Sequence, residues 1–523
     1  MNKTSPLLNQ VYYGCWLLFA ASITLSKFAT TFFFLAIGIS WLWSIFLRKG
    51  KTLFAFRSAV LWSALALFLI FVLGLWNTEN FDYAWKDLNS KTPLFFLPLW
   101  AFTGPQLTLK KYKEILLFLI LGGMCSALIG FVNFTFFNQE VILNFRKLSP
   151  FISHIRLSLV LCIAVAYLYQ QLFLRKSNLR WLLLLPIFFI LYFLNRLQSL
   201  TGFFVLLILA LYTFVKQTSW KDQPWLRGLA LGVFVMVALF FGIKIFRISQ
   251  LVFQDEVLPE APELYTVNNN PYVHARYDST TENGHLVYWF ICDQELEQEW
   301  PKRSKLSLDT LIKGFPLRST LYRYMSSRGF RKDSLGLTKM RMEDILAVER
   351  GIPNWYYNEH GGMDARLYTT LWEINNLRRG SNPLHTSLSR RLFLWKIASS
   401  CIAENFWLGV GTGDVLEVME KEHLKSPLAE LHRVWRPHNQ FLTLWLSGGF
   451  FALILFLILL GYYWKGIRSI DFMLAVGFMV MFFSLFWEDT LESQAGSSLF
   501  ALLVLVPQLF RTSITSIGQD NEG

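Results

Sequence analysis

The chain has 523 residues, of which 54% are hydrophobic, 17% aromatic and only 16% charged, and its mean hydropathy is +0.37. This composition excludes an ordinary soluble domain and indicates a polytopic membrane protein whose main solvent is lipid. The formal net charge is +13, which would indicate nucleic-acid binding only if the basic residues gathered on a soluble domain.

Nine apolar runs that we interpret as membrane-spanning helices precede residue 248, although the first two and the fourth are short for a span. No small-residue cleavage site follows the first run, so we interpret it as a retained helix and not as a secretory signal peptide. Residues 1–247 are therefore predicted to form an N-terminal transmembrane bundle. Its spans are expected near residues 11–26, 30–47, 57–76, 92–104, 114–136, 152–171, 179–195, 199–216 and 227–247.

The one large hydrophilic segment, residues 248–437, comes next. It carries 23 Lys and Arg against 24 Asp and Glu, so the rest of the chain carries 26 against 12. The excess positive charge belongs to the membrane part, and nucleic acid is not expected as a partner. Aromatic residues and helical patterns such as the one at 342–346 predict that this segment folds as a mainly helical domain.

A glycine-rich run, Gly409-Val410-Gly411-Thr412-Gly413, lies near the end of this segment. It resembles part of a dinucleotide-binding fingerprint, but no strand–helix–strand pattern surrounds it. A tight turn that brings backbone close to a partner is the safer interpretation.

Three further spans are predicted near residues 438–463, 470–487 and 495–511, which gives about twelve transmembrane helices in all. Basic residues fall in every second short loop, so those loops, both termini and a short tail at 512–523 are predicted to be cytoplasmic. The segment 248–437 then lies in the periplasm, where Cys292 and Cys401 could pair, although no spacing requires it. The basic loop residues are Arg48, Lys49, Lys51, Arg57, Lys110, Lys111, Lys113, Arg175, Lys176, Arg180, Lys216, Lys221, Arg227, Lys465, Arg468 and Arg511.

A polar cluster, Arg436-Pro437-His438-Asn439-Gln440, opens the tenth apolar run. A histidine at a helix N-terminus feels a dipole that disfavours the imidazolium, so we expect His438 to be a neutral base near pH 7. Such a base can take a proton from a hydroxyl group. The alternative is a polar anchor at the membrane boundary with no chemical role.

Several short motifs occur in a characteristic order along the chain. Together with the topology, this order resembles the O-antigen ligase superfamily, and the resemblance covers most of the chain. The motifs are His154-Ile155-Arg156, Ser199-Leu200-Thr201-Gly202, Arg391-Leu392-Phe393-Leu394-Trp395, Glu404-Asn405-Phe406-Trp407-Leu408-Gly409-Val410-Gly411-Thr412-Gly413, His438-Asn439-Gln440-Phe441-Leu442, Gly448-Gly449 and Glu488-Asp489-Thr490-Leu491-Glu492.

The resemblance implies glycan transfer on the outer face of a bacterial inner membrane. The expected donor is a glycan on undecaprenyl pyrophosphate, and the expected acceptor is a hydroxyl of the lipid A core. Because this donor arrives activated, the resemblance implies a metal-independent glycosyltransferase without a cofactor. The sequence also carries no His, Cys or carboxylate cluster with metal-ligand spacing outside the membrane.

This chemistry needs a base for the acceptor hydroxyl and fixed cations for the pyrophosphate leaving group. The catalytic candidates are His438 as base, with Arg391 and Arg196 as cations. Arg391 matches an arginine of the family's loop, whereas Leu200 stands where the family tends to carry another, and Arg196 lies one helical turn earlier. A carboxylate of the motif at 488–492 could orient the histidine. The substrate-binding candidates are Arg156, Arg390, Arg436, Asn439 and His154.

Other functions remain open at this point. The same motifs serve an O-antigen-type polymerase that joins carrier-linked glycan units, and an O-oligosaccharyltransferase that modifies protein. A transporter or flippase would also have about twelve helices, but it should show similar halves and charges at mid-membrane. No internal repeat is evident, and the polar residues gather at the outer boundary.

Overall fold

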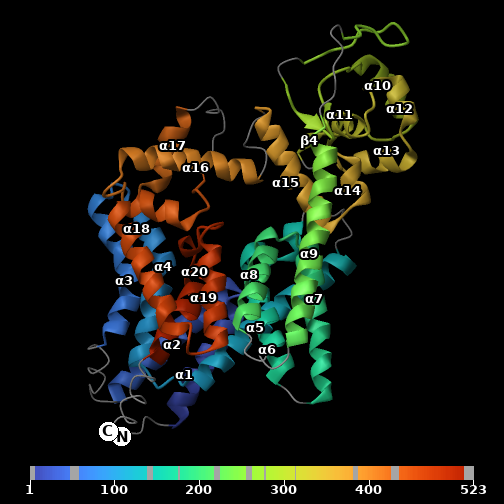
Figure 1. The fold of residues 1–523 in the computed structure, drawn as a ribbon. Helices are drawn as coiled ribbons and strands as arrows, with labels where there is room; N and C mark the ends of the chain where they lie inside the picture. The colour runs from blue at the N-terminus through green and yellow to red at the C-terminus, as the bar shows by residue number, and fades with distance from the viewer. Residues whose placement is uncertain are drawn as a thin grey trace. The chain divides into compact units, whose positions relative to one another are not determined.

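The computed structural model describes residues 6–47, 58–137, 145–174, 177–216, 224–254, 262–275, 278–312, 314–380, 387–425 and 435–511. Within them the chain is mainly helical with two short antiparallel sheets, as expected for an all-α membrane protein. The chain forms two compact units (Figure 1). The first unit consists of residues 1–139, 146–213 and 394–523, and the second consists of residues 140–145 and 214–393. The predicted tail at 512–523 and the basic loop residues at 48–57, 175–176 and 221 lie outside the described residues.

The first unit is a bundle of apolar helices. Those long and apolar enough to cross a membrane span Lys27–Leu47, Ala59–Asn77, Leu109–Phe136, His154–Leu174, Asn178–Arg196 and Gln440–Ile467. The chain is thus a multi-pass membrane protein, while the count of twelve spans stays a prediction. The α-helices of this unit are α1 (Pro6–Ser22), α2 (Lys27–Leu47), α3 (Ala59–Leu73), α4 (Phe81–Thr103), α5 (Leu109–Val132), α6 (His154–Leu174), α7 (Leu184–Arg196), α8 (Leu200–Lys216), α17 (Val415–Leu424), α18 (Gln440–Ile467), α19 (Phe472–Ser484) and α20 (Gln494–Phe500).

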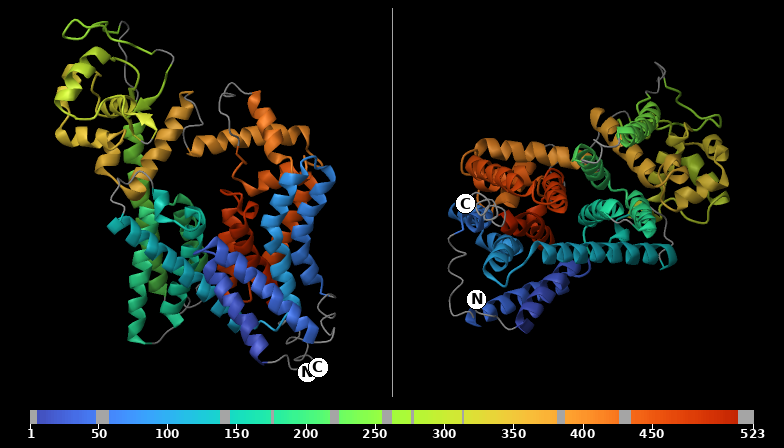
Figure 2. Two further views of the ribbon diagram at one scale, coloured as in Figure 1. Left: turned by 180° about the vertical axis from the view of Figure 1, so that it is seen from behind. Right: turned by 60° about the horizontal axis from the view of Figure 1, so that its bottom comes forward.

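Helices far apart in the sequence pack side by side in this unit. α4 packs against α20, and α6 packs against α19 (Figures 1 and 2). Large aromatic side chains such as Trp16, Phe19 and Phe500 are fully buried between the helices. The last predicted span, 495–511, is not one α-helix, because α20 continues into a π-helical turn at Ala501–Leu505 and a 3-10 turn at Val506–Arg511.

The second unit contains α9 (Pro224–Val252) and a small helical domain with its own core. Leu296, Trp300, Leu321 and Met325 are buried in that core. The five cysteines of the chain are free thiols, including Cys292 and Cys401. The remaining elements of this unit are β1 (Thr281–Glu282), β2 (His285–Leu286), α10 (Asp293–Glu299), β3 (Leu311–Ile312), β4 (Phe315–Pro316), α11 (Leu317–Ser327), α12 (Ser334–Lys339), α13 (Met342–Glu349), α14 (Trp355–Glu359) and α15 (Gly362–Arg378). One further helix, α16 (Ser387–Glu404), begins in the second unit and ends in the first.

The glycine-rich run at 409–413 forms the close turn that the sequence predicts. Gly449 interrupts α18 with a non-helical backbone, and two carbonyl groups just before it accept hydrogen bonds from the N–H groups of Val410 and Gly411 at 2.8 and 2.9 Å. On its other side the turn contacts the segment before α4, where the Asn77 side chain donates to the Gly409 carbonyl at 2.7 Å. The turn therefore supplies partners for backbone groups that the break in α18 leaves open.

Gly411 has no room for a side chain. Its φ is +98°, and a Cβ atom would lie 2.5 Å from the carbonyl oxygen of Asn77 and 2.6 Å from the hydroxyl of Thr78. Both the backbone conformation and the contact thus require glycine.

We predict that Gly411→Ala lowers the free energy of unfolding by about 1–3 kcal/mol or more, because it adds a clash to an unfavourable φ. Gly461→Ala is the matched control, since a Cβ at Gly461 in α18 meets nothing within 4 Å. The control should be neutral or slightly stabilising, as alanine favours helix. Thermal unfolding of both purified proteins in detergent measures the difference, and equal midpoints would contradict the assigned turn.

Candidate functional site

His438 precedes the first turn of α18 in a strained backbone conformation. Its φ is +54°, in the left-handed region that residues other than glycine seldom adopt. The next residue, Asn439, is the N-cap, and its Oδ1 accepts the N–H groups of Phe441 and Leu442 at 3.0 and 3.1 Å. The histidine side chain remains 35% exposed. The helix start thus holds the imidazole at a fixed position where it can still be reached.

The carboxylate of Asp489 fixes this backbone. Its Oδ2 accepts the His438 N–H at 2.9 Å, and its Oδ1 accepts the Asn439 N–H at 3.0 Å and the Thr443 hydroxyl at 2.7 Å. The same carboxylate lies 3.7 Å from Nδ1 of the imidazole. Burial raises the pKa of Asp489, against the effects of the Thr443 hydrogen bond and of His438.

Asp489 is thus the carboxylate of the 488–492 motif that lies beside the imidazole, 3.7 Å from its Nδ1. A carboxylate in this position can orient a histidine ring.

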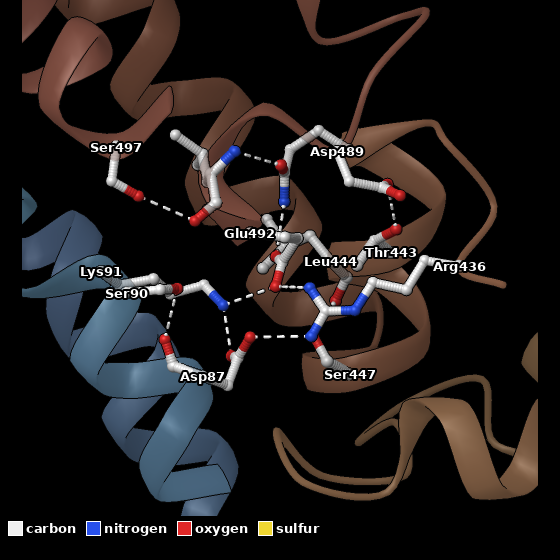
Figure 3. Close-up of polar contacts among 12 residues, drawn as sticks. Asp87, Ser90, Lys91, Arg436, Thr443, Leu444, Ser447, Asp489, Glu492 and Ser497 are labelled. Atoms are coloured by element: carbon white, nitrogen blue, oxygen red, sulfur yellow. Dashed lines mark hydrogen bonds and ion pairs between the residues drawn. The ribbon is translucent and has the colours of Figure 1, made fainter. Parts of the chain in front are cut away.

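Four buried charged side chains form a closed ring beside this segment, and we call them the charge ring (Figure 3). Lys91 binds Asp87 and also Glu492, the latter at 2.6 Å. Arg436 binds the same two carboxylates, with 2.8 Å between its Nη2 and Oδ1 of Asp87. Each cation thus contacts both anions, and the two charges of each sign balance. Arg436 also donates to the Tyr83 hydroxyl at 2.5 Å.

The charge ring is almost completely removed from solvent, since the side chain of Lys91 is 1% exposed and that of Glu492 is 7% exposed. Burial alone would lower the pKa of Arg436 and raise that of Glu492. Their attraction reverses both effects, so the pKa of Arg436 lies above its ordinary value and that of Glu492 below. Arg436 and Glu492 are therefore held charged, whereas burial and the neighbouring Glu492 raise the pKa of Asp87 to about 6. Removing one cation or one carboxylate would leave a buried group without its partner.

Gln440 joins the charge ring to the start of α18. Its side chain is fully buried, donates to Oε1 of Glu492 at 3.1 Å and accepts the Leu491 N–H at 2.8 Å. Together with Asp489, these contacts attach residues 436–443 to residues 489–492 at several points. The histidine lies inside that attached segment.

Sequence reasoning missed Asp87 and Lys91. The predicted span began at residue 92, just after them, whereas α4 starts at Phe81. A carboxylate four residues before a lysine, ahead of an apolar run, is a pattern that can indicate a buried pair. Their partners Arg436 and Glu492 lie 345 or more residues later in the sequence, so no local pattern around Asp87 and Lys91 indicates the pairing.

The predicted cations lie in four different places in the structure. Arg156 lies near the start of α6, where Glu488 and Asp489 act on it electrostatically. Its Nε is buried, and no described residue accepts a hydrogen bond from it. His154 begins the same helix and has contacts of its own. Arg156 therefore has an unused donor in the neighbourhood of the Asp489 carboxylate.

Arg196 ends α7, and the turn after it packs against α6. In that turn Gln198 has a φ of +54°, and a Cβ atom on Gly202 would lie 3.1 Å from Ser158. The start of α8 therefore lies beside the first turns of α6, two residues beyond Arg156. Leu200, at the position where the family tends to carry arginine, begins α8.

Arg390 and Arg391 lie in the second unit, in the first turn of α16. Both are engaged in interactions there, and Arg391 acts electrostatically on Glu373 of α15. One helical turn later, in the first unit, the Trp395 indole N–H donates to the Pro437 carbonyl at 2.8 Å. α16 thus contacts the residue just before the histidine.

Arg436 and Asn439 are committed to contacts within the protein. Arg436 belongs to the charge ring, and Asn439 caps α18 while its Nδ2 donates to the Phe486 carbonyl at 3.3 Å. These contacts favour positioning roles for both residues over the substrate-binding roles expected from the sequence.

We predict that Lys91→Met lowers the free energy of unfolding by about 3–5 kcal/mol, because two buried carboxylates would then face a single cation. The double variant Asp87→Asn, Lys91→Met restores one charge of each sign and should recover a large part of that loss. Lys86→Met, on the exposed side of α4, is the control and should have little effect. Thermal unfolding in detergent compares the three, and a double variant less stable than Lys91→Met would disprove the balanced ring.

One family model matches part of the chain. Residues 360–457 match the family model described as O-Antigen ligase. The matched segment contains the predicted site residues Arg390, Arg391, Arg436, His438 and Asn439. No curated protein matched the chain. The match supports a membrane glycosyltransferase-like enzyme with activity of the O-antigen ligase or polymerase type. The match to residues 360–457 thus identifies an O-antigen ligase domain in this part of the chain and supports its resemblance to the O-antigen ligase superfamily.

Proposed function

We propose that the protein transfers a glycan from an undecaprenyl-pyrophosphate carrier to a hydroxyl of the lipid A core oligosaccharide. The reaction takes place on the periplasmic face of the bacterial inner membrane, with about twelve membrane-spanning helices and residues 248–437 outside. The observation that carries the proposal is the reachable imidazole of His438, whose Nδ1 lies 3.7 Å from the buried Asp489 carboxylate.

In this proposal His438 is the general base. The acceptor hydroxyl gives its proton to the imidazole while its oxygen attacks the anomeric carbon of the donor sugar. The bond from that carbon to the pyrophosphate oxygen breaks, and the electron pair leaves with the carrier pyrophosphate. Asp489 stabilises the imidazolium that forms, because a fixed carboxylate beside the ring favours its positive charge.

Arginines stabilise the leaving pyrophosphate. Arg156 is the first choice in the bundle, because its buried Nε has no hydrogen-bond acceptor among the described residues and it lies in the electrostatic neighbourhood of Asp489. Guanidinium groups bind phosphate oxygens in pairs and keep their charge at all physiological pH values. Arg196 is proposed beside it. Arg391 and Arg390 are proposed for the same role on the resemblance of their sequence motif alone.

Arg436 has a different role in this proposal. Its guanidinium contacts two carboxylates and a tyrosine hydroxyl, so a phosphate would have to displace strong buried partners. It acts through the backbone, by holding the segment that carries the histidine.

We predict that His438→Ala reduces transfer at least 100-fold, the usual contribution of a positioned base. In cells with only this variant, polymer on lipid A should disappear from lipopolysaccharide gels while carrier-linked polymer accumulates. His360→Ala, an exposed histidine of the second unit, is the control and should leave the gel pattern unchanged.

The same gels test the acceptor. Normal lipopolysaccharide together with normal glycoproteins in cells with only His438→Ala would disprove the role of the base. Lipid A cores that carry single glycan units would indicate a polymerase, and loss confined to glycoproteins would indicate an O-oligosaccharyltransferase. Either pattern would overturn the lipid A core as acceptor while keeping the chemistry of the site.

We also predict that Arg156→Ala raises the KM for the carrier-linked donor roughly ten- to a hundred-fold, the cost of lost charge-assisted hydrogen bonds. Arg156→Lys should be intermediate, because lysine keeps the charge and loses the paired geometry. Arg468→Ala, an exposed arginine after α18, is the control. Initial rates in membrane vesicles give the KM values, and an unchanged KM for Arg156→Ala would remove it from the donor site.

A further inference from the structure

A second site-like feature lies at the other end of the bundle. A cavity of about 550 Å³ is bounded by α5, α6 and the start of α19. Its lining comes from the first turns of α5 and the last turns of α6, whereas the candidate glycan site lies near the start of α6. Because α6 has 21 residues, the two ends are about 30 Å apart, which is the thickness of a bilayer's hydrocarbon core.

One part of the cavity wall is rich in hydrogen-bond donors. Lys110, Tyr167, Gln170 and Gln171 line it, and no described residue pairs with their side chains. Lys113 also lines it and binds Asp471 at 2.6 Å, yet its side chain is 45% exposed. Donors without protein partners at a cavity wall favour an anionic ligand, whose oxygens accept from several of them.

The acidic groups nearby are already engaged. Glu114, the one carboxylate in the lining, accepts a hydrogen bond from the Tyr13 hydroxyl. Asp471 binds Lys113 and caps α19 by accepting the Met473 N–H at 2.8 Å. Lys110 therefore keeps a positive charge that no described carboxylate balances.

The position of the lysines in α5 strengthens this point. Lys110, Lys111 and Lys113 lie in the first turns of the helix, and no acidic residue accompanies them in the first turn. Positive side chains are unfavourable at a helix N-terminus, which carries a partial positive charge of its own. A bound anion would offset the repulsion among the lysines and the repulsion between the lysines and the helix N-terminus.

The remaining wall is apolar. It is formed by Leu109, Leu116, Leu117, Leu174 and Met473. A free inorganic anion gains nothing from such a surface, whereas an amphiphile places its headgroup on the donors and its hydrocarbon on the leucines. The polar wall of the cavity thus matches the headgroup of a phospholipid, and the apolar wall matches its hydrocarbon chains.

We propose that this cavity binds an anionic phospholipid of the cytoplasmic leaflet. Its phosphate contacts Lys110, Lys113 and the glutamine amides, and the beginning of an acyl chain lies along Leu116 and Leu117. Basic pockets between transmembrane helices at the cytoplasmic side bind such headgroups in other membrane proteins. The inference does not depend on the proposed glycan transfer.

Native mass spectrometry of the purified full-length protein tests the proposal. Phosphatidylglycerol and phosphatidylcholine are titrated separately, and retained lipid is counted for each variant. We expect phosphatidylglycerol to be retained in preference to phosphatidylcholine. The affinity for phosphatidylglycerol should fall roughly five-fold for each lysine removed, first in the single variant Lys110→Gln and then in the double variant Lys110→Gln, Lys113→Gln. Lys465→Gln, an exposed lysine of α18 outside the cavity, is the control and should bind as the unmodified protein does.

Two further measurements test the apolar wall and separate binding from folding. Leu117→Trp fills the apolar part of the cavity and keeps both lysines, so this variant should also lose phosphatidylglycerol. Lys110→Gln removes an exposed side chain without a described partner, so its melting temperature in lipid-free detergent should not change. Equal retention of the two lipids, or equal loss in Lys465→Gln, would overturn the site. Stabilisation by inorganic phosphate equal to that by phosphatidylglycerol would overturn the lipid as its occupant.

Discussion

The charge ring of Asp87, Lys91, Arg436 and Glu492 is the interaction on which the candidate site depends. It joins α4 to the segment before α18 and to the turn before α20 (Figure 3). Packing of apolar surfaces alone would not fix the positions of these three parts of the chain relative to one another. Hydrophobic contacts are non-directional, whereas two cations that each bind two carboxylates allow only one arrangement. The ring therefore defines where residue 436 lies, and with it the histidine two residues later.

Further contacts fix the segment that carries His438. Asp489 accepts the backbone N–H of His438 and also lies beside its ring, so one carboxylate contacts both the backbone and the side chain of the proposed base. Trp395 contacts the preceding carbonyl from α16. The glycine turn at 409–413 supports the broken middle of α18. Positive φ at His438 is retained because contacts on both sides over-determine it.

The sequence predicted the helices and the histidine better than the ring. Apolar runs gave the positions of most described helices, because a bilayer imposes their length and composition. His438 stood out because a titratable residue at the start of an apolar run is rare. Asp87 and Lys91 were missed because their partners are hundreds of residues away, and no local pattern records such a pairing. For the same reason the contacts of Arg436, a substrate-binding candidate in the sequence, with Asp87 and Glu492 could not be predicted.

In the proposed mechanism His438 acts in the chemical step and not in holding the donor. A single experiment separates the two when purified His438→Ala and unmodified protein receive labelled carrier-linked glycan, and binding and transfer are measured in the same samples. The variant is expected to bind the donor with an affinity comparable to that of the unmodified protein and to transfer it to the acceptor hydroxyl at least 100-fold more slowly. Transfer at the unmodified rate, or loss of donor binding, would contradict this mechanism.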